Sequence, residues 1–380
     1  MTADTSDAFL SGQGIPVDLA RIDAELAGLW GPAAEREGGP DLDHPAVTRI
    51  AQANLIIGGL GAAPGRIDGV LDSVVARYPC RAILLRQSNA TDRAVHAEAS
   101  AMCHLPAPGL PQVCSERIVL HAGSGAFDLL PGAVRPLLEP GLPVVLWWLN
   151  DPRAAESVFR TLAEESTRLI LDLPESGTDL DALRLALDVG LKHFGRDTAW
   201  FGISGWRELI AQLFDPPGSE ATRSRIAKVQ IRASRALTNQ PPRGAAWLLG
   251  WLAGQLGWKR DQLHQSAPGT LTATFLGPSG PITTEILTEI DPNAPFARIT
   301  GVALTTREPE GEGTFRLDRL GDPSLDVRVE VCAPDYCDLP RFVRTPEADP
   351  ARSVAAALES ARDDPPYRHA LPHALWLLGG

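Results

Sequence analysis

Two cysteines form the pair of residues whose type and spacing best suggest chemistry. Cys332 and Cys337 flank the loop Ala333-Pro334-Asp335-Tyr336, directly after a predicted strand. A thiol pair at this spacing is compatible with simple burial, with a redox pair or with half of a metal site. Because no second CxxC and no paired histidine lies nearby in the sequence, the pattern favours burial over a redox role, and a redox role over a metal.

Phosphate-binding and catalytic motifs point to no reaction. The chain contains neither GxGxxG nor GxxxxGK[ST], and it lacks the GxSxG elbow of the hydrolases. The glycine-containing stretch His121–Gly125 is interpreted as an ordinary strand-to-helix turn, and Ser204 as a helix N-cap. We therefore expect no catalytic, cofactor-binding or metal-binding residues, no cofactor, and a protein that is not an enzyme.

Tryptophan is the residue type that stands out, with nine in the chain. Trp147 and Trp148 are neighbours in an apolar run, so in a strand their side chains must point to opposite faces. Core burial of both is the favoured interpretation, but tryptophan is also enriched as an anchor at protein interfaces. The candidate partner-binding residues are Trp147, Trp148 and Trp206, together with the charged residues Asp151 and Arg207.

Charge, length and cysteine content exclude several classes of protein. The chain has 380 residues and a formal net charge of -12, so a nucleic-acid or anionic-membrane surface is not expected. The first residues have no apolar segment of a signal peptide, and no apolar run is long enough to span a bilayer, which predicts a cytoplasmic protein. Five cysteines are odd in number and sparse, which favours reduced thiols over a disulfide framework.

The stretch 142–172 predicts the unit that organises the first half of the chain. Val144–Trp148 is an apolar strand, a helix follows Glu156, and Arg168–Leu173 returns as a second strand. A strand that is apolar at nearly every position suits a parallel sheet covered on both faces. Further strands are predicted at 53–57 and 82–85, and an antiparallel pair at 96–102 and 116–120. Predicted helices cover 19–30, 67–78, 127–138, 180–194 and, within 200–214, a segment that begins near Ser204.

The second half has a different pattern. A buried helix at 244–258 lies between a strand at 226–233 and a run of short alternating strands from 270 to 332, with one or two closing helices after 351. The predicted fold class is α/β. A mixed, mainly parallel sheet flanked by helices precedes an α+β domain with an antiparallel meander. The expected domains are an N-terminal helix and linker at 1–45, the α/β domain at 46–218 and the α+β domain at 219–380.

Five segments in register carry a resemblance to a known family. The sequence resembles the OpcA family, the glucose-6-phosphate dehydrogenase assembly proteins, over roughly residues 45–335. The segments are Tyr78–Arg81, Cys114–Ile118, Leu142–Trp148, Trp206–Leu209 with Phe214–Pro217, and Leu249–Ala253 with Leu256–Trp258.

The resemblance implies a non-catalytic partner and allosteric activator. Such a protein binds glucose-6-phosphate dehydrogenase, favours its active oligomer and supports NADPH production by the oxidative pentose phosphate pathway. It also implies a possible redox role for Cys332 and Cys337. The alternative class is an enzyme or small-molecule-binding α/β protein that uses Asn150, Asp151 and Asp172 at the C-terminal ends of the parallel strands.

Overall fold

The structure is a computed structural model of all 380 residues. It describes part of the N-terminal region and most of the chain from residue 47 onward. The described residues are 9–11, 15–22, 24, 26, 47–60, 64–104, 112–173, 180–192, 195–216, 219–235, 242–267, 269–290, 298–321, 326–345, 349–360 and 363–379.

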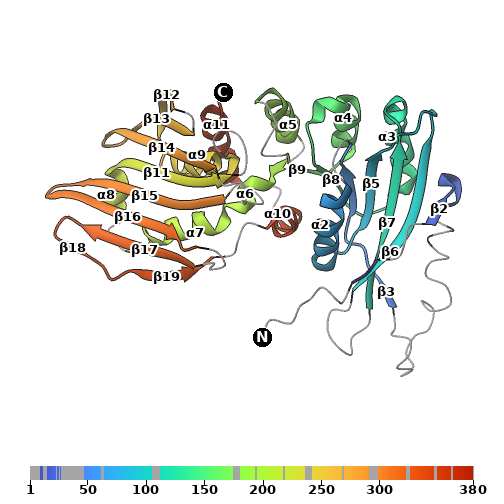
Figure 1. The fold of residues 1–380 in the computed structure, drawn as a ribbon, viewed down its shortest axis with the longest axis horizontal. Coiled ribbons are helices and arrows are strands. Elements are labelled where there is room, and N and C mark those ends of the chain that lie inside the picture. Colours follow the sequence, from blue (N-terminus) through green and yellow to red (C-terminus); the bar gives the residue numbers. More distant parts are fainter. Residues whose placement is uncertain are drawn as a thin grey trace, which may run out of the picture. The chain divides into compact units, whose positions relative to one another are not determined.

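The chain divides into two compact units (Figure 1). Unit 1 comprises residues 1–174, 181–198 and 350–362, and unit 2 comprises 175–180, 199–349 and 363–380. The boundary predicted at 218 thus falls inside unit 2, because the helix that precedes it packs with the later segments. The proline-rich stretch after Phe214 marks the end of a helix within one unit.

Unit 1 is built on sheet A, which has ten strands among the described residues. Six strands form a parallel series in the order β7-β5-β4-β8-β9-β10. Strands β6, β1 and β2 extend the sheet in antiparallel pairs, and β3 pairs with β7. The bounds are β1 Phe9–Ser11, β2 Ile15–Val17, β3 Val47–Arg49, β4 Asn54–Gly58, β5 Arg81–Gln87, β6 Val95–His104, β7 Gln112–Ala122, β8 Val144–Trp148, β9 Arg168–Leu171 and β10 Arg196–Asp197.

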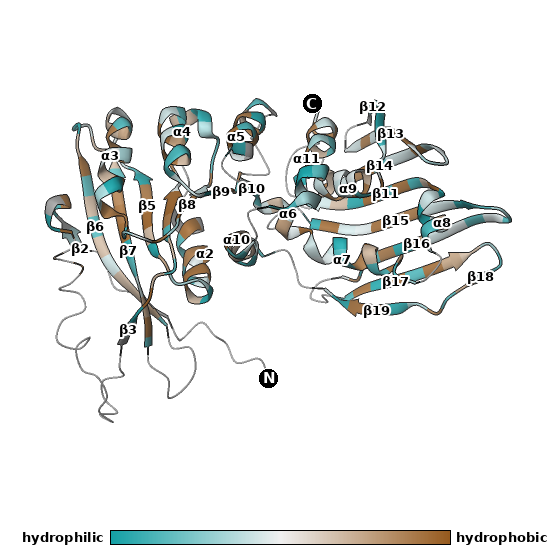
Figure 2. Ribbon diagram, turned by 180° about the vertical axis from the view of Figure 1, so that it is seen from behind, coloured by the Kyte–Doolittle hydropathy of each residue, from teal (hydrophilic) through white to brown (hydrophobic). Residues whose placement is uncertain are grey.

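The central strands of sheet A are buried on both faces, as their unbroken apolar sequences predict. Every residue of β4 and the first five of β5 are buried. Figure 2 shows β5, one of these strands, coloured as hydrophobic. The unit's longer helices are α2 Pro64–Arg77, α4 Glu156–Glu165, α5 Leu180–Lys192 and α10 Pro350–Glu359. The predicted strand-helix-strand unit at 142–172 is confirmed, with β8 and β9 in a parallel pair. The predicted fold class is confirmed as well.

Three helix predictions need comment. The segment 127–138 is η3 Ser124–Leu129, α3 Leu130–Val134 and η4 Arg135–Leu137, because Pro131 and Pro136 interrupt a single helix. The helix predicted to begin near Ser204 is confirmed as α7 Ser204–Gln212, and a short helix, α6 Thr198–Gly202, precedes it. Ser204 is not the N-cap, which is Ile203 without a capping side chain. Of the helix predicted at 19–30, η2 Leu19–Arg21 is described, and most of the remainder lies outside the described residues.

Unit 2 is built on sheet B, whose nine described strands have the order β12-β13-β14-β11-β15-β16-β17-β18, with β19 also on β17. The simple meander prediction is wrong at one place, because β11 lies between β14 and β15 and pairs parallel with β14. The strands are β11 Ile226–Arg235, β12 Lys259–Ala267, β13 Thr270–Gly277, β14 Gly280–Ile290, β15 Arg298–Glu308, β16 Gly311–Arg319, β17 Asp326–Ala333, β18 Tyr336–Cys337 and β19 Arg341–Arg344.

Two helices, α9 Arg243–Gln255 and α11 Pro365–Leu377, pack tightly in unit 2. A Cβ at Gly250 would lie 2.8 Å from the carbonyl oxygen of Ala370, and one at Gly254 would lie 2.7 Å from that of His369. These two glycines, four residues apart on one face of α9, therefore allow the close approach of α11. No helix in the described part of the chain is long and apolar enough to cross a membrane.

Candidate partner-binding surface

Trp147 and Trp148 are core residues of unit 1. Their exposed fractions are 0% and 1%. The Trp148 ring lies 5.0 Å from that of Phe159 on α4, and a Cβ at Gly58 would come within 2.1 Å of it. The two neighbouring side chains thus fill layers on opposite faces of sheet A, and in this structure neither offers surface to a partner.

Asp151 starts the short helix η5 Pro152–Ala155. Its carboxylate accepts hydrogen bonds from the Arg153 guanidinium and, at 2.9 Å, from the Arg153 backbone N–H. The Arg153 side chain, more than the backbone bond, holds the pKa of Asp151 below its ordinary value. Asp151 is therefore an ionised cap that is partly accessible to solvent.

The other residues proposed for a small-molecule site also have structural roles. The Asn150 amide donates to the backbone carbonyl of Leu60 at 3.0 Å. The buried Asp172 accepts a hydrogen bond from the Thr198 hydroxyl at 2.9 Å, which ties the end of β9 to the start of α6. Both side chains thus join segments that are distant in the sequence.

Trp206 and Arg207 lie in unit 2, on α7. Trp206 is 5% exposed. The Arg207 guanidinium lies 3.7 Å from the centre of the Trp200 ring, which is the geometry of a cation–π contact. Burial lowers the pKa of Arg207 to about 10, so its charge is retained at neutral pH.

The aromatic ring beneath Arg207 belongs to a cluster of three. Trp200 meets Trp247 and Tyr367 edge-on at 5.7 and 5.5 Å, and Trp247 stacks on Tyr367 at 4.8 Å. The Trp200 indole N–H donates to Asp364, which also caps α11. Arg207 therefore covers a rigid aromatic core that joins α6, α9 and α11.

The five predicted partner-binding residues do not form one group within either unit. Trp147, Trp148 and Asp151 belong to unit 1, whereas Trp206 and Arg207 belong to unit 2. Three of the five are tryptophans with at most 5% exposure. Asp151 and Arg207 are the members of the set with appreciable solvent access.

A buried ion pair explains two of the sequence segments that carry the family resemblance. Arg81 donates to Glu116 at 2.6 Å, and both side chains are at most 5% exposed. Arg81 also reaches Glu139 at 2.8 Å and the Leu137 carbonyl at 2.9 Å, while Arg49 pairs with Glu116 at 2.7 Å. The network joins β3, β5, β7 and the segment after η4, so these residues stabilise the fold of unit 1.

The expectation of reduced thiols is wrong. Cys103 is bonded to Cys114 across β6 and β7, and Cys332 is bonded to Cys337. Sequence reasoning placed β6 and β7 antiparallel but did not align these two cysteines, which face each other in the register. Cys80 is free and fully buried, and burial raises the pKa of its thiol to about 12.

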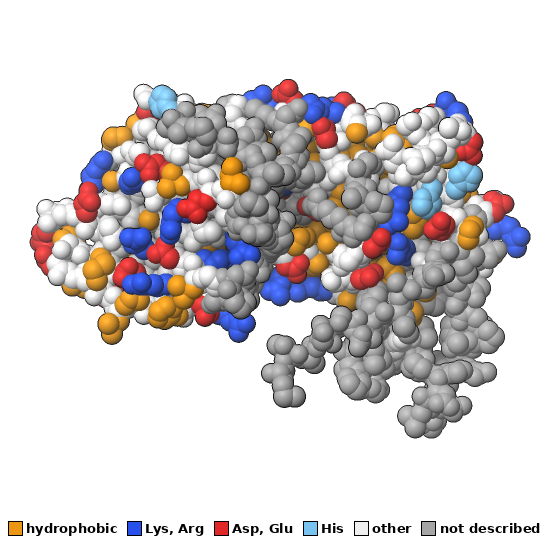
Figure 3. All heavy atoms as spheres, viewed as in Figure 1, with side chains coloured by type: hydrophobic (Ala, Val, Ile, Leu, Met, Phe, Trp, Pro, Cys, Tyr) orange, Lys and Arg blue, Asp and Glu red, His pale blue; other side chains and the backbone are white. Residues whose placement is uncertain are grey.

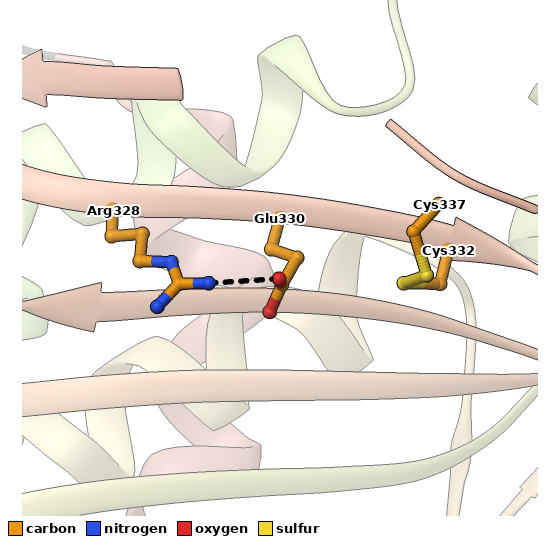
Figure 4. The surroundings of a disulfide bond; sticks show 4 residues. All are labelled: Arg328, Glu330, Cys332 and Cys337. Atoms are coloured by element: carbon orange, nitrogen blue, oxygen red, sulfur yellow. Dashed lines mark hydrogen bonds and ion pairs between the residues drawn. A yellow bond between two sulfur atoms is a disulfide. The ribbon is translucent and has the colours of Figure 1, made fainter. Parts of the chain in front are cut away.

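The prediction that Cys332 and Cys337 are buried is also wrong, because Cys337 is exposed and Cys332 only partly covered. Figure 4 shows the bond between β17 and β18, with Arg328, Glu330 and Cys332 on one side of β17. Arg328 pairs with Glu330 at 2.9 Å. Among the described residues, no group of three or more His, Cys, Asp or Glu side chains is arranged to hold a metal ion.

Beside this disulfide lies an apolar surface that the sequence reasoning missed. Tyr336, Leu339 and Phe342 are 64%, 89% and 64% exposed. In Figure 3, hydrophobic side chains gather along the margin of unit 2 where Figure 1 places β18 and β19. The available signal was the pair of strand-favouring residues Phe342 and Val343 between Arg341 and Arg344. We call residues 336–344 the edge surface.

The two sheets, the buried ion network and an exposed apolar edge describe a two-unit α/β protein whose most accessible feature suits contact with another protein. Comparison of the sequence with models of known protein families identifies the family. Residues 72–186 match the N-terminal domain, and residues 195–371 the C-terminal domain, of the family described as "Glucose-6-phosphate dehydrogenase subunit". The chain belongs to the OpcA family, as the sequence predicts.

Curated relatives agree over part of their length. The chain is 30% identical over 193 residues to "Putative OxPP cycle protein OpcA" of Synechocystis sp., which covers 50% of this chain and 40% of that protein. It is 31% identical over 207 residues to the protein of the same name from Nostoc punctiforme, covering 53% and 43%. The matches thus span less than half the length of these relatives.

Solved structures with similar folds are oxidoreductases. The 3-ketoreductase KijD10 from Actinomadura kijaniata, in complex with TDP-benzene and NADP, has a TM-score of 0.48 at 12% identity over 84% of this chain and 95% of its own. The apo scyllo-inositol dehydrogenase from Lactobacillus casei has a TM-score of 0.42 at 10% identity over 87% and 90%. Likeness at this level says nothing about activity.

Proposed function

We propose that this protein is a non-catalytic assembly and activation factor that binds glucose-6-phosphate dehydrogenase. The observation that carries the proposal is the pair of matches at 72–186 and 195–371, both to domains described as those of a glucose-6-phosphate dehydrogenase subunit. Binding would favour the active oligomer of the dehydrogenase and so support NADPH production by the oxidative pentose phosphate pathway.

The proposed mechanism is a shift of an assembly equilibrium. A protein that binds one oligomeric state more tightly moves the population toward that state by an amount set by the difference in affinity. A tenfold difference in affinity corresponds to about 1.4 kcal/mol. The edge surface supports such a contact, because three large apolar side chains are exposed there within seven residues.

Mass photometry of the purified dehydrogenase, with and without this protein, tests the proposal. At micromolar concentrations we expect a new species whose mass is the sum of both proteins, a larger fraction of the highest dehydrogenase oligomer, and a higher turnover rate. An unrelated acidic protein of similar net charge is the control. If the mass distribution and the rate are both unchanged, the proposal is wrong.

We also propose that Cys332 and Cys337 make this binding sensitive to redox state. Their disulfide joins β18 to β17 directly beside the exposed Tyr336, so reduction releases one covalent constraint on the edge surface. The same mass measurement, made with oxidised protein and with protein reduced and alkylated, compares the two states. The double variant Cys332→Ser/Cys337→Ser should match the reduced protein and should not respond to reductant.

A further inference from the structure

The edge surface is the outer margin of sheet B. Strand β17 pairs on one side with β16, and on the other with β18 through Cys332 and with β19 through Asp326–Val329. Within the described residues, no strand pairs with the far side of β19. An unpaired edge presents backbone N–H and C=O groups that another extended chain can bind.

The register identifies which backbone groups point outward. The Asp338 N–H donates to the Val331 carbonyl at 2.8 Å, which makes Cys332 and Cys337 a non-hydrogen-bonded pair. Because backbone groups alternate in direction along a strand, the N–H and C=O groups of Val327 and Val329 point toward β19. The Leu320 N–H donates to the Asp326 carbonyl at 3.0 Å. The backbone groups of Asp326 therefore point toward the β16 side of β17, as this alternation requires.

The backbone N–H and C=O groups of Phe342 and Arg344 consequently point away from β17. Phe342 faces Arg328, and Arg344 faces Asp326, both as non-hydrogen-bonded pairs. In such pairs the N–H and C=O of each residue point away from the neighbouring strand. Two donors and two acceptors, spaced as a strand requires, therefore lie on the open side of β19.

The side chains of this edge combine positive charge with exposed apolar surface. Short length and charged residues blunt many natural edges, so a partner strand must neutralise the two arginines of β19 when it pairs. Here Leu339 is the most exposed large apolar side chain in the described chain at 89%, and Phe342 is 64% exposed. Arg341 and Arg344 are exposed as well, so a four-residue strand with two positive charges stands on a chain of net charge -12.

We propose that β19 is a site for strand addition by an extended segment of a partner protein. The segment has the pattern acidic-apolar-apolar-acidic, which places carboxylates opposite Arg341 and Arg344 and apolar side chains opposite Phe342 and Val343. Opposite charges in directly facing strand positions stabilise pairing. The proposal rests on the proposed function for the identity of the partner, since the segment is assigned to the dehydrogenase.

A second copy of this chain fits the edge less well. In an antiparallel pair, residues whose backbone groups point outward must face one another, so Phe342 would lie opposite Phe342 or Arg344 of the other copy. Either register brings the four arginines of two β19 strands together without a carboxylate, and like charges repel. An acidic segment removes this repulsion and satisfies the same backbone groups.

Synthetic peptides test strand addition without the dehydrogenase. The probe is a fluorescent ten-residue peptide, blocked at both termini, with Glu-Val-Ile-Glu at its centre and serine and threonine flanks. Binding to the full-length protein is followed by anisotropy. We expect the Lys-Val-Ile-Lys peptide to bind at least about tenfold more weakly. A peptide of the acidic sequence with N-methylated backbone amides should not bind, because it cannot form the ladder.

Variants locate the binding to β19. Phe342→Pro removes one outward N–H and is compatible with an edge strand, so it should abolish binding of the acidic peptide. Phe342→Ala keeps the N–H and should weaken binding only several-fold, and Ile290→Ala, at a 57% exposed residue of β14, should leave it unchanged. Arg341→Glu with Arg344→Glu should reverse the preference toward the lysine peptide.

The outcomes separate this inference from the proposed function. If the acidic peptide binds and the dehydrogenase does not, strand addition stands and the proposed function fails. If the dehydrogenase binds the wild-type protein and Phe342→Pro equally well, strand addition is overturned and the proposed function stands. If the two peptides bind alike, strand addition is overturned, and the measurement with the dehydrogenase decides the proposed function separately. A concentration-dependent dimer that Phe342→Pro abolishes would instead assign the edge to a second copy and overturn the proposal.

Discussion

Strands β8 and β19 are both apolar at their centres, yet β8 is buried and β19 is exposed. Strand β8, with the sequence VVLWW, lies between β4 and β9 and is covered on both faces, so that Trp147 and Trp148 are at most 1% exposed. Strand β19, with the sequence RFVR, lies at the margin of sheet B, where Phe342 is 64% exposed. Position in the sheet, more than hydrophobicity, decides whether an aromatic residue is available to a partner.

The charged residues of the two regions differ in the same way. Arg81 is enclosed by Glu116, Glu139 and a backbone carbonyl, all within 3 Å, and serves only the fold. Arg341 and Arg344 are exposed on β19. A buried arginine must be neutralised by its own chain, whereas an exposed one can be neutralised by another.

The largest expected effect is the loss of stability when a buried side chain of β8 is truncated. Trp148→Ala should lower the free energy of unfolding of unit 1 by about 4 kcal/mol, because the cavity between Gly58 and Phe159 cannot close completely. Phe342→Ala should change stability by less than about 0.5 kcal/mol. Urea titration followed by circular dichroism measures both values. Equal costs for the two variants would show that burial does not distinguish the two strands.

The sequence predicted the core better than the surface. Strands such as Val144–Trp148 carry their own evidence, since an unbroken apolar run is stable only when both faces are covered. The same reasoning found the antiparallel pair β6 and β7. It did not place β11 between β14 and β15, because that arrangement depends on a long-range parallel pair with no local signal.

The predicted site residues show the same limit. Tryptophan drew attention as a type that anchors interfaces, but Trp147, Trp148 and Trp206 all lie in cores. Whether a large residue is buried depends on what packs against it, which a single sequence does not specify. Strand β19 is only four residues long, too short for a periodic pattern to stand out.

An intermediate effect is expected at Arg207, which lies between the two extremes. Arg207→Ala should cost about 1–2 kcal/mol, since it removes the cation–π contact with Trp200 and exposes part of the aromatic cluster. Arg207→Lys keeps the charge but loses the planar stacking, so it should recover only part of this loss. Thermal unfolding of the three proteins measures the order.

The same variants also address partner binding. At a temperature where Arg207→Ala remains folded, its affinity for the dehydrogenase should equal that of the wild type, because the Arg207 guanidinium lies against Trp200 of its own unit. A loss of affinity much larger than the loss of stability would instead place Arg207 in the interface. Glu220→Ala, on α8 Ser219–Ser224 and outside the aromatic cluster, is the control for a surface change elsewhere in unit 2.

Among the cysteines we expect the smallest effect on stability and the largest difference in solvent accessibility. At pH 8 a thiol whose pKa is about 12 is almost entirely protonated, and only the thiolate reacts with iodoacetamide. Cys80 should therefore be alkylated no faster than the protein unfolds. Cys337 is exposed and Cys114 fully buried, so a mild reductant should release Cys332 and Cys337 before Cys103 and Cys114. Mass spectrometry of peptides after timed alkylation gives the order, and release of the β6–β7 bond first would show that the interior of sheet A is more accessible than the edge of sheet B.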